Sequence, residues 1–254
     1  MKSAMMREET VFGPIHSRRL GASLGINLLP RKGKFCNFDC IYCECGWNKD
    51  GKEDNVLPTA AQVRRALEDK LAELMLEGKH IDSITFSGDG EPTLNPDFPQ
   101  IVEDTLTLRN GFFPDAKVSV LSNATRLGNP AIVAALKKVD NPILKIDAAS
   151  PEAITLINRP AFPYDLEQIV ENLRAFDGDF ILQTMFLRCP GFDSTAPEAL
   201  GAWMDLVREL QPREIQCYSL DRPTPEQNLE KIPLETLKKL VRPLVEEGFR
   251  VECF

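Results

Sequence analysis

Two patterns of apolar and polar residues alternate along this chain. Short runs rich in aliphatic and β-branched residues predict strands, and these runs span 21–29, 81–88, 117–123, 142–149, 180–187, 214–220 and 249–254. Between them, apolar residues recur every three to four positions, which predicts helices over 59–78, 95–111, 129–139, 165–178, 197–210 and 233–248. Such alternation favours parallel strands joined by right-handed helical crossovers.

The first predicted helix carries clear local signals at both ends. Thr59 and Gln62 form a capping box at its start, and Gly78 is expected to end it. One face of this helix is apolar, and it consists of Val63, Leu67, Leu71 and Leu74.

Prolines and a glycine mark two further helices. Asn95 is the expected cap of the second helix, with Pro96 in its first turn and Gly111 after its end. Pro243 lies inside the last helix, where it predicts a kink or a split.

The same alternation predicts one α/β domain over residues 1–254. About six strand–helix repeats favour a partial (β/α)6 TIM-like barrel, with parallel strands inside and helices outside, over a closed eight-stranded barrel. A flat doubly wound sheet is the alternative. In either fold, ligands are expected at the C-terminal ends of the strands.

The composition is that of an ordinary globular protein with an excess of acid. Of 254 residues, 43% are hydrophobic and 27% are charged, and the net charge of −8 argues against a surface that binds nucleic acid everywhere. No secretory signal or membrane-spanning run is visible, so we expect a cytoplasmic protein. In a reducing compartment, the odd number of 7 cysteines favours metal binding over a disulfide framework.

Four cysteines gather in the segment CNFDCIYCECG, directly after the first predicted strand. Thiolates are soft ligands that suit zinc, copper(I) or iron–sulfur clusters. A structural zinc site usually takes two well-separated pairs of cysteines, so zinc is disfavoured here and stays an alternative. Three thiolates from one loop suit three irons of a cubane and leave the fourth iron open.

The spacing Cys36-x3-Cys40-x2-Cys43, with Tyr42 before the third cysteine, resembles the signature of the radical S-adenosylmethionine (radical SAM) superfamily. The resemblance implies a [4Fe–4S] cluster on these three cysteines, S-adenosylmethionine on the open iron with Tyr42 beside it, and a reductant such as flavodoxin or ferredoxin. Reductive cleavage would yield a 5′-deoxyadenosyl radical that abstracts hydrogen from a substrate. Cys45 is then expected not to be a ligand.

The segment SGDGEPTL follows the second predicted strand and resembles the glycine-rich motif of the same superfamily. By this resemblance, Ser87, Gly88, Asp89 and Gly90 form a cofactor-binding turn, where glycine lets the backbone approach the methionine end. Glu91 is expected to accept a hydrogen bond from the cofactor's ammonium group. Taken by itself, the segment also fits a turn with a helix-capping acid.

Three polar residues at later strand ends are further candidates. Lys145 and Asp147 alternate along one strand, so both side chains are expected on the same face, in the barrel lumen. By resemblance, Asp147 binds the cofactor's ribose or amino group and Lys145 is the candidate catalytic residue; a buried ion pair that only orders the site is the alternative. Asn123 is either a cofactor ligand or a turn residue.

The segments SRRLGASLGIN, LKIDAAS, INRP and YSLDRPTP resemble small Fe–S oxidoreductases related to wyosine tRNA-modifying enzymes. Those enzymes carry a second cluster on an N-terminal cysteine trio, but no cysteine precedes Cys36 here. RNA is slightly favoured as the substrate, with a glycyl-radical activase and a non-catalytic electron-transfer or zinc-binding protein as alternatives. A basic cluster supports RNA, and it consists of Arg18, Arg19, Arg31, Lys32 and Lys34.

The remaining polar residues have two interpretations each. His16 precedes the first predicted strand and contacts either an anionic substrate or solvent. Asp221 and Arg222 form either a substrate mouth or an ordered turn. We expect His80 to be structural and Cys189 to be a small apolar filler.

Overall fold

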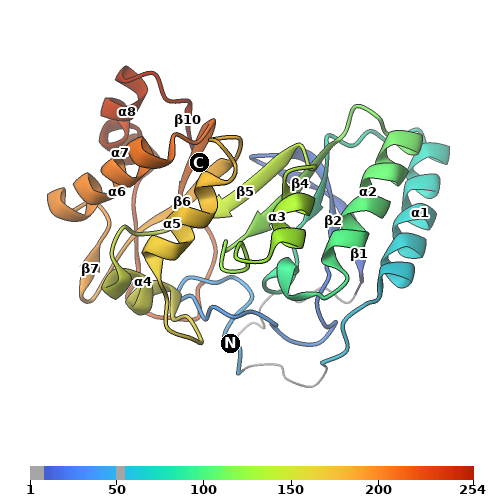
Figure 1. Ribbon diagram of the computed structural model, residues 1–254, viewed down its shortest axis with the longest axis horizontal. Coiled ribbons are helices and arrows are strands. Elements are labelled where there is room, and N and C mark those ends of the chain that lie inside the picture. Colours follow the sequence, from blue (N-terminus) through green and yellow to red (C-terminus); the bar gives the residue numbers. More distant parts are fainter. Residues whose placement is uncertain (1–8, 50–54) are drawn as a thin grey trace. The chain divides into compact units, whose positions relative to one another are not determined.

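Strands and helices alternate along the chain in the computed structural model, which describes residues 9–49 and 55–254 (Figure 1). The described residues fall into two units. The first lies within Met1–Cys36, Asn48–Ser122 and Gly128–Pro142, and the second lies within Asn37–Trp47, Asn123–Leu127 and Ile143–Phe254. None of the helices in these described ranges is both long enough and apolar enough to span a membrane.

The first unit is a mostly parallel set of strands covered by helices. Its strands lie in the order β1 (Val11–Ser17), β2 (Gly21–Ile26), β3 (Ser83–Phe86) and β4 (Lys117–Ser122). β1 and β2 form an antiparallel hairpin, while β3 is parallel to both of its neighbours. The helical segments are α1 (Ala60–Leu76), the 3-10 helix η1 (Pro92–Leu94), α2 (Phe98–Phe112) and α3 (Pro130–Leu136).

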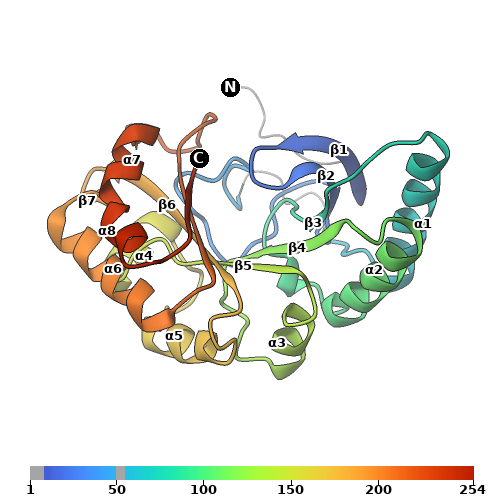
Figure 2. The same ribbon diagram turned by 90° about the horizontal axis from the view of Figure 1, so that it is seen from above.

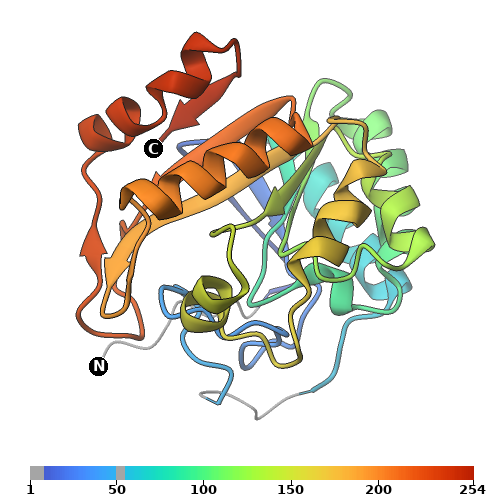
Figure 3. The same ribbon diagram turned by 60° about the vertical axis from the view of Figure 1, so that its left-hand side comes forward.

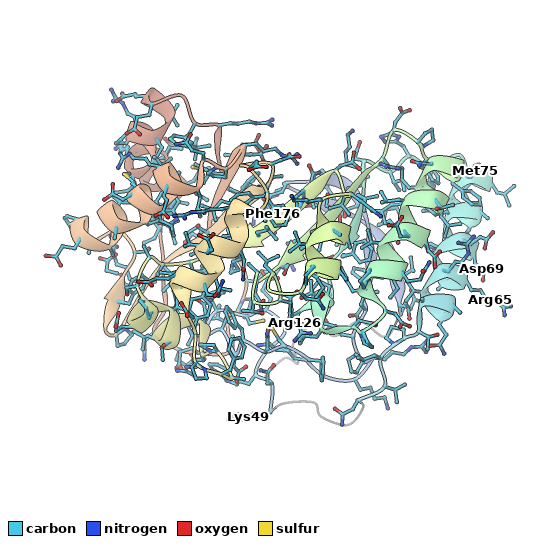
Figure 4. The ribbon with its side chains drawn as sticks, in the orientation of Figure 1. Lys49, Arg65, Asp69, Met75, Arg126 and Phe176 are labelled. Carbon is cyan, nitrogen blue, oxygen red and sulfur yellow. The ribbon has the colours of Figure 1, made fainter. Side chains whose placement is uncertain are left out.

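Helix α1 confirms its sequence prediction at both ends. The Thr59 side chain accepts from the backbone of Gln62, whose side chain accepts from the Thr59 backbone, and a turn at Glu77 and Gly78 ends the helix. The predicted apolar face is buried, and α2 lies beside α1 (Figure 2). Arg65 and Met75 project from the opposite face of α1 into solvent (Figure 4).

Helix α2 begins later than predicted. The helix begins at Phe98, after the N-cap residue Asp97. Asn95 caps the turn that precedes the helix, because its side-chain oxygen accepts from the Asp97 amide at 2.9 Å. Its side-chain nitrogen donates to the carbonyls of Leu28 and Pro58, at 3.0 and 2.9 Å. Gly111 lies inside α2 rather than after its end. Asn95 therefore has the expected local role one turn early and also links distant segments, which local sequence does not reveal.

Strand β1 was not predicted at all. It contains Gly13 and Pro14, two residues that weaken a strand assignment from sequence, and its pairing with β2 is interrupted between Phe12 and Ile15. The prediction of at most seven strands was therefore too low.

The second unit has parallel strands in the order β5 (Asn141–Lys145, of which the last three residues lie in this unit), β6 (Ile181–Cys189), β8 (Glu214–Ser219) and β10 (Val251–Cys253). The two-residue strands β7 (Phe192–Asp193) and β9 (Glu230–Lys231) pair antiparallel with the end of β6. Its helices are α4 (Pro151–Asn158), α5 (Leu166–Arg174), α6 (Pro197–Leu210), α7 (Leu234–Leu240) and α8 (Arg242–Glu246).

Two features of this unit bear on the predictions. The last predicted helix is split into α7 and α8 at Val241, as Pro243 indicated. Helix α4 was not predicted, and it proves central to the site.

Helix α6 lies along the strands (Figure 3). The ring of Trp203 on α6 packs edge-on against that of Phe186, with 5.1 Å between the ring centres, and its Nε1 donates to the Thr184 hydroxyl at 3.0 Å.

Candidate functional site

The cysteine loop of the second unit is fastened to the C-terminal end of α4. The backbone amide of Asp39 donates to the carbonyl of Asn158 at 2.9 Å, and that of Ile41 donates to the carbonyl of Ile157 at 2.9 Å. The last carbonyls of a helix have no partner within it, so the loop satisfies them. Ile41 is 2% exposed and belongs to the apolar core around Ile157.

The residues after α4 extend this attachment. Arg159 adopts a left-handed conformation that ends the helix, and its guanidinium lies 4.8 Å from the centre of the Trp47 ring. Pro160 forms a bridge with Phe38. The segment INRP was singled out in the sequence only because it resembles a family segment. In the structure, its residues contact the cysteine loop and hold it in place.

Asn158 connects the cysteine loop to the polar interior of the second unit. It is 1% exposed, and its side-chain nitrogen lies 2.7 Å from Asp147 Oδ2, 2.8 Å from the Tyr42 hydroxyl and 3.3 Å from Cys40 Sγ. The Asp147 carboxylate can only accept, which identifies this atom as the amide nitrogen. The opposite atom, Asn158 Oδ1, is buried and has no hydrogen-bond partner within the described residues.

Asp147 is the anion at the centre of this network. Its Oδ2 accepts from Tyr42 and Asn158, while its Oδ1 accepts from the backbone amide of Met185 at 2.9 Å and lies 3.2 Å from Lys145 Nζ. Lys145 and Asp147 therefore share one face, as strand alternation predicted. Because both carboxylate oxygens are engaged by protein groups, Asp147 organises its neighbours.

Lys145 lies between two aromatic rings. Its Nζ is 4.9 Å from the centre of the Tyr42 ring and 4.7 Å from that of Tyr218, and it donates to the Tyr218 hydroxyl. Burial alone would lower the pKa of Lys145, but Asp147 and Tyr218 raise it above its ordinary value. The amine is therefore held as an ammonium ion. Sequence reasoning quoted Tyr218 only as the first residue of YSLDRPTP and gave it no role.

The thiols of the cysteine loop could bind a metal ion, but Cys40 would need the positive charge of that ion to become a thiolate. No disulfide forms within residues 9–49 and 55–254, and Cys36, Cys40, Cys43 and Cys45 are each partly exposed. Burial, Cys43 and Asp147 raise the pKa of Cys40 to about 11, against the lowering effect of Asn158. A bound cation would reverse this shift and favour the thiolate.

The assignment of individual ligands stays a prediction. Cys36 belongs to the first unit, where its carbonyl accepts from Asn48 at 3.1 Å, whereas Cys40, Cys43 and Cys45 belong to the second. Across residues 9–49 and 55–254, no three histidine, cysteine, aspartate or glutamate side chains are grouped as they are around a single metal ion. The choice of Cys36, Cys40 and Cys43 thus rests on sequence spacing and thiol chemistry.

The glycine-rich turn of the first unit is built closely against its own chain. A Cβ on Gly90, whose φ is +148°, would lie 1.9 Å from the Phe35 carbonyl oxygen, and one on Gly88 would lie 2.1 Å from Asn27 Oδ1. The amide of Phe35 donates to the Asp89 carbonyl at 2.8 Å. Both glycines are therefore required by internal packing, whatever they approach besides.

Asn27 directly follows β2 and contacts this turn, a role that sequence reasoning missed. Its Oδ1 accepts from the amides of Leu29 at 3.2 Å and Asp89 at 3.3 Å, while its Nδ2 is buried with no partner among the described residues. Asp89 is fully buried, and Ser87 is half-buried with its hydroxyl 3.5 Å from the Thr85 carbonyl. The turn thus carries one orphan donor that suits a polar ligand.

Glu91 caps a helix, the alternative that its sequence left open. It is 2% exposed, and its Oε1 accepts from the Thr93 amide at 3.1 Å, the Thr93 hydroxyl at 2.6 Å and the Ser122 hydroxyl at 2.9 Å. The side chain therefore fixes the N-terminus of η1. A role toward the cofactor's ammonium stays a prediction.

Asn123 is engaged by protein groups. Its nitrogen donates to Asn37 Oδ1 at 2.7 Å, and its oxygen accepts from the amide and hydroxyl of Thr125. Asn37 in turn donates to the Thr125 hydroxyl at 2.7 Å. Within the second unit, these bonds join the start of the cysteine loop to the turn at Asn123 and Thr125, which is the turn role considered for Asn123.

The predicted basic cluster does not form as one exposed rim. Lys34 is only 5% exposed, which corrects the prediction that it faces a polyanion. Arg31 lies in a groove lined by Glu9, Asp69 and Glu73. Arg18 is exposed. Because Lys34 is buried and Arg31 lies among acidic side chains, the electrostatic argument for RNA is weaker than the sequence indicated.

The remaining candidates have structural partners. His80 lies 2.8 Å from Asp82, whose other oxygen accepts from the Ala22 amide, so His80 has the expected structural role. Asp221 pairs with Lys231 at 3.4 Å. Arg222 donates to Glu44 of the cysteine loop at 2.8 Å, so the turn after β8 restrains that loop.

The sequence comparisons match most of this chain. The family model of the radical SAM superfamily matches residues 31–188. A UPF0026 protein from Synechocystis is 31% identical over 221 residues, which cover 85% of this chain and 77% of that protein. A GTPase Obg from Brachyspira hyodysenteriae is 29% identical over 92% of this chain, which spans only 33% of that protein.

Solved structures share the fold at low identity. A radical SAM methyltransferase from Sphaerobacter thermophilus has a TM-score of 0.68 at 12% identity, over 91% of this chain and 65% of that one. Streptococcus suis SuiB, solved with its precursor peptide SuiA, has a TM-score of 0.66 at 15% identity, over 91% of this chain and 48% of SuiB. These neighbours are partial TIM barrels, so the predicted fold class is confirmed.

A third neighbour agrees with the predicted subgroup. The structure of TYW1 with a lysine-pyruvate adduct has a TM-score of 0.62 at 15% identity, over 89% of this chain and 74% of that one. Radical SAM proteins use a [4Fe–4S] cluster and S-adenosylmethionine, and SuiB has also been solved with S-adenosylmethionine bound.

Proposed function

This chain belongs to the radical SAM superfamily, and we propose that it is an enzyme that holds a [4Fe–4S] cluster on Cys36, Cys40 and Cys43. The observation that carries the proposal is the buried network around Cys40. Asn158 donates toward its sulfur, and Asp147 holds Asn158 and Tyr42 in place. A loop that only filled space would need no such polar framework, which is costly to bury unless fully bonded.

One unpartnered polar atom in each unit supports a polar ligand in that unit. In the first unit, Asn27 Nδ2, beside the glycine-rich turn, is a donor that suits a carboxylate. In the second unit, Asn158 Oδ1, beside the cysteine loop, is an acceptor that suits an ammonium or a hydroxyl. S-adenosylmethionine carries a carboxylate, an ammonium and hydroxyl groups, and with the cluster it would supply a carbon radical that removes a hydrogen atom from a substrate.

The chain's own residues would position and shield this chemistry. The turn from Ser87 to Glu91 would hold the methionine end of the cofactor, with Asn27 as an additional donor. Lys145 would present a fixed positive charge, because Asp147 and Tyr218 keep it protonated. We propose that this charge binds an anionic group of the cofactor or substrate, and that Asp147 acts by orienting Lys145.

Anaerobic reconstitution with iron and sulfide tests the cluster proposal. We expect about four irons per chain, an EPR signal on reduction that changes when S-adenosylmethionine is added, and 5′-deoxyadenosine as a product. Cys40→Ser should lose iron, whereas Cys189→Ser should retain it. Zinc as the sole bound metal, or a signal that ignores S-adenosylmethionine, would reject the proposal.

RNA remains the proposed substrate class to test first, because the sequence resembles small relatives of wyosine tRNA-modifying enzymes. If it is correct, tRNA binding should weaken steeply with added salt, and reversing the charges of Arg18 and Arg19 should weaken it further. If tRNA binds no better than it binds an ordinary acidic protein, a small metabolite or a partner glycyl-radical protein takes its place.

A further inference from the structure

We propose that Cys217 and Cys253 form a redox-active pair that is reversibly oxidised to a disulfide between β8 and the C-terminal strand β10. Neither cysteine belongs to the cysteine loop. The proposal rests on the pairing of these two strands, so it is independent of the iron–sulfur function.

Strand register brings the two thiols together. β10 runs parallel to β8, and Cys253 lies directly opposite Cys217. Adjacent strands are about 4.8 Å apart, which falls within the Cα separation of roughly 4.4–6.8 Å that a disulfide requires. Paired residues point to the same face of a sheet, so the two thiols occupy neighbouring positions on that face. Their proximity also shifts the two pKa values in opposite directions.

The environments of the two thiols differ in the way an attacking and a resolving cysteine require. Cys217 is fully buried, and burial together with Cys253 raises its pKa well above the ordinary value. Cys253 is partly exposed, and the neighbouring Cys217 thiol and the ammonium of Lys238 on α7 lower its pKa. Cys253 is thus the accessible nucleophile, and Cys217 is shielded until a mixed disulfide forms.

The chemistry balances with a small-molecule disulfide as the oxidant. The Cys253 thiolate attacks that disulfide, forms a mixed disulfide and expels one thiolate. Cys217 then loses its proton and attacks the sulfur of Cys253, which expels the second thiolate. Two protein thiols are oxidised by two electrons, and one external disulfide is reduced to two thiols. A dithiol reductant reverses both steps.

The bond would restrain a short element beside the site. β10 has only three residues and joins the sheet through β8. The residue after Cys217 is Tyr218, whose hydroxyl accepts from Lys145. A disulfide at Cys217 would therefore restrain the end of β8, which carries Tyr218. Through Tyr218, oxidation of the pair would also restrain Lys145.

Thiol trapping and mass spectrometry of the full-length holoprotein test the pair. The protein is equilibrated without oxygen in buffers of oxidised and reduced glutathione, alkylated, and digested with trypsin. The sequence then places Cys217 alone in peptide 214–231 and Cys253 alone in peptide 251–254. We expect a linked 214–231/251–254 species that grows with the oxidised fraction and disappears with dithiothreitol.

Variants separate this outcome from nonspecific oxidation. Cys253→Ser, at the partly exposed position, should abolish the linked species and leave Cys217 unmodified. Cys189→Ser should leave the linked species unchanged. Oxidation should raise the midpoint of thermal unfolding by about 5 °C in the unsubstituted protein and not in Cys253→Ser. Accumulation of glutathione on Cys253 without any linked peptide, at every ratio tested, overturns the proposal.

Discussion

Replacement of Asn158 by alanine tests the network that fastens the cysteine loop. The variant loses a hydrogen bond to the Asp147 carboxylate at 2.7 Å, where bonds to charged groups contribute about 1.5–3 kcal/mol, and one to the Tyr42 hydroxyl at 2.8 Å, where a neutral bond contributes about 0.5–1.5 kcal/mol. It also loses the weaker contact with Cys40 at 3.3 Å. The substitution also removes the unpaired Asn158 Oδ1, and a buried unpaired polar group costs about 1–3 kcal/mol. Its removal therefore offsets part of the lost free energy of unfolding. We expect a net loss of about 2 kcal/mol in the free energy of unfolding.

Two measurements check this value. A loss of about 2 kcal/mol in a chain of this size should lower the midpoint of thermal unfolding by about 4–8 °C, measured on cluster-free protein. In reconstituted protein, loss of the N–H donor to Cys40 should lower the reduction potential of the cluster, since hydrogen bonds to the sulfurs stabilise the reduced form. A purely structural role of Asn158 would change the midpoint and leave the potential unaltered.

Matched variants decide whether hydrogen bonding is the cause. Asn172→Ala on α5 removes a side chain that only accepts from Gln168 at 3.2 Å, so its unfolding free energy should change by about 0.5 kcal/mol or less. Asn158→Asp keeps the shape and places a carboxylate against Asp147, so it should destabilise at least as much as alanine. If Asn158→Ala behaves like Asn172→Ala, or Asn158→Asp is harmless, the reasoning is refuted.

Three further predictions concern the cluster, the cofactor and the fold. Cys45→Ser should retain about four irons per chain after reconstitution, and loss of the cluster would show that Cys45 is a ligand. Glu91→Ala should weaken S-adenosylmethionine binding in equilibrium titrations at unchanged iron content; unchanged affinity would leave Glu91 as a helix cap only. Burial opposes the charge of Asp140, but hydrogen bonds from Val118 and Arg109 lower its pKa below the ordinary value. A carboxyl group whose pKa is lowered on folding stabilises the fold above its unfolded pKa of about 4, and this stabilisation is lost as the pH falls. In urea titrations, Asp140→Asn should therefore be less stable than the unsubstituted protein at pH 7 and equal to it near pH 2. A difference that does not vary with pH would contradict this assignment.

Local sequence is sufficient to predict the features that depend on neighbouring residues. The capping box of Thr59 and Gln62, the buried face of α1 and the break near Pro243 all involve contacts within a few positions, so local propensity decides them. The spacing of the cysteines is likewise a local property. Periodicity was also enough to identify the α/β class, because it reports which face of each element is buried.

The tertiary structure alone decided which polar groups meet. Asn95 was expected only as a local cap, and the distant carbonyls of Leu28 and Pro58 also engage it. Lys34 appeared to be a surface cation and is buried. Asn158 carried no chemical signal, and yet it contacts Cys40 across 118 positions of sequence. Such contacts are set by how strands and helices pack in space, and the burial that makes them strong does not exist until the chain has folded.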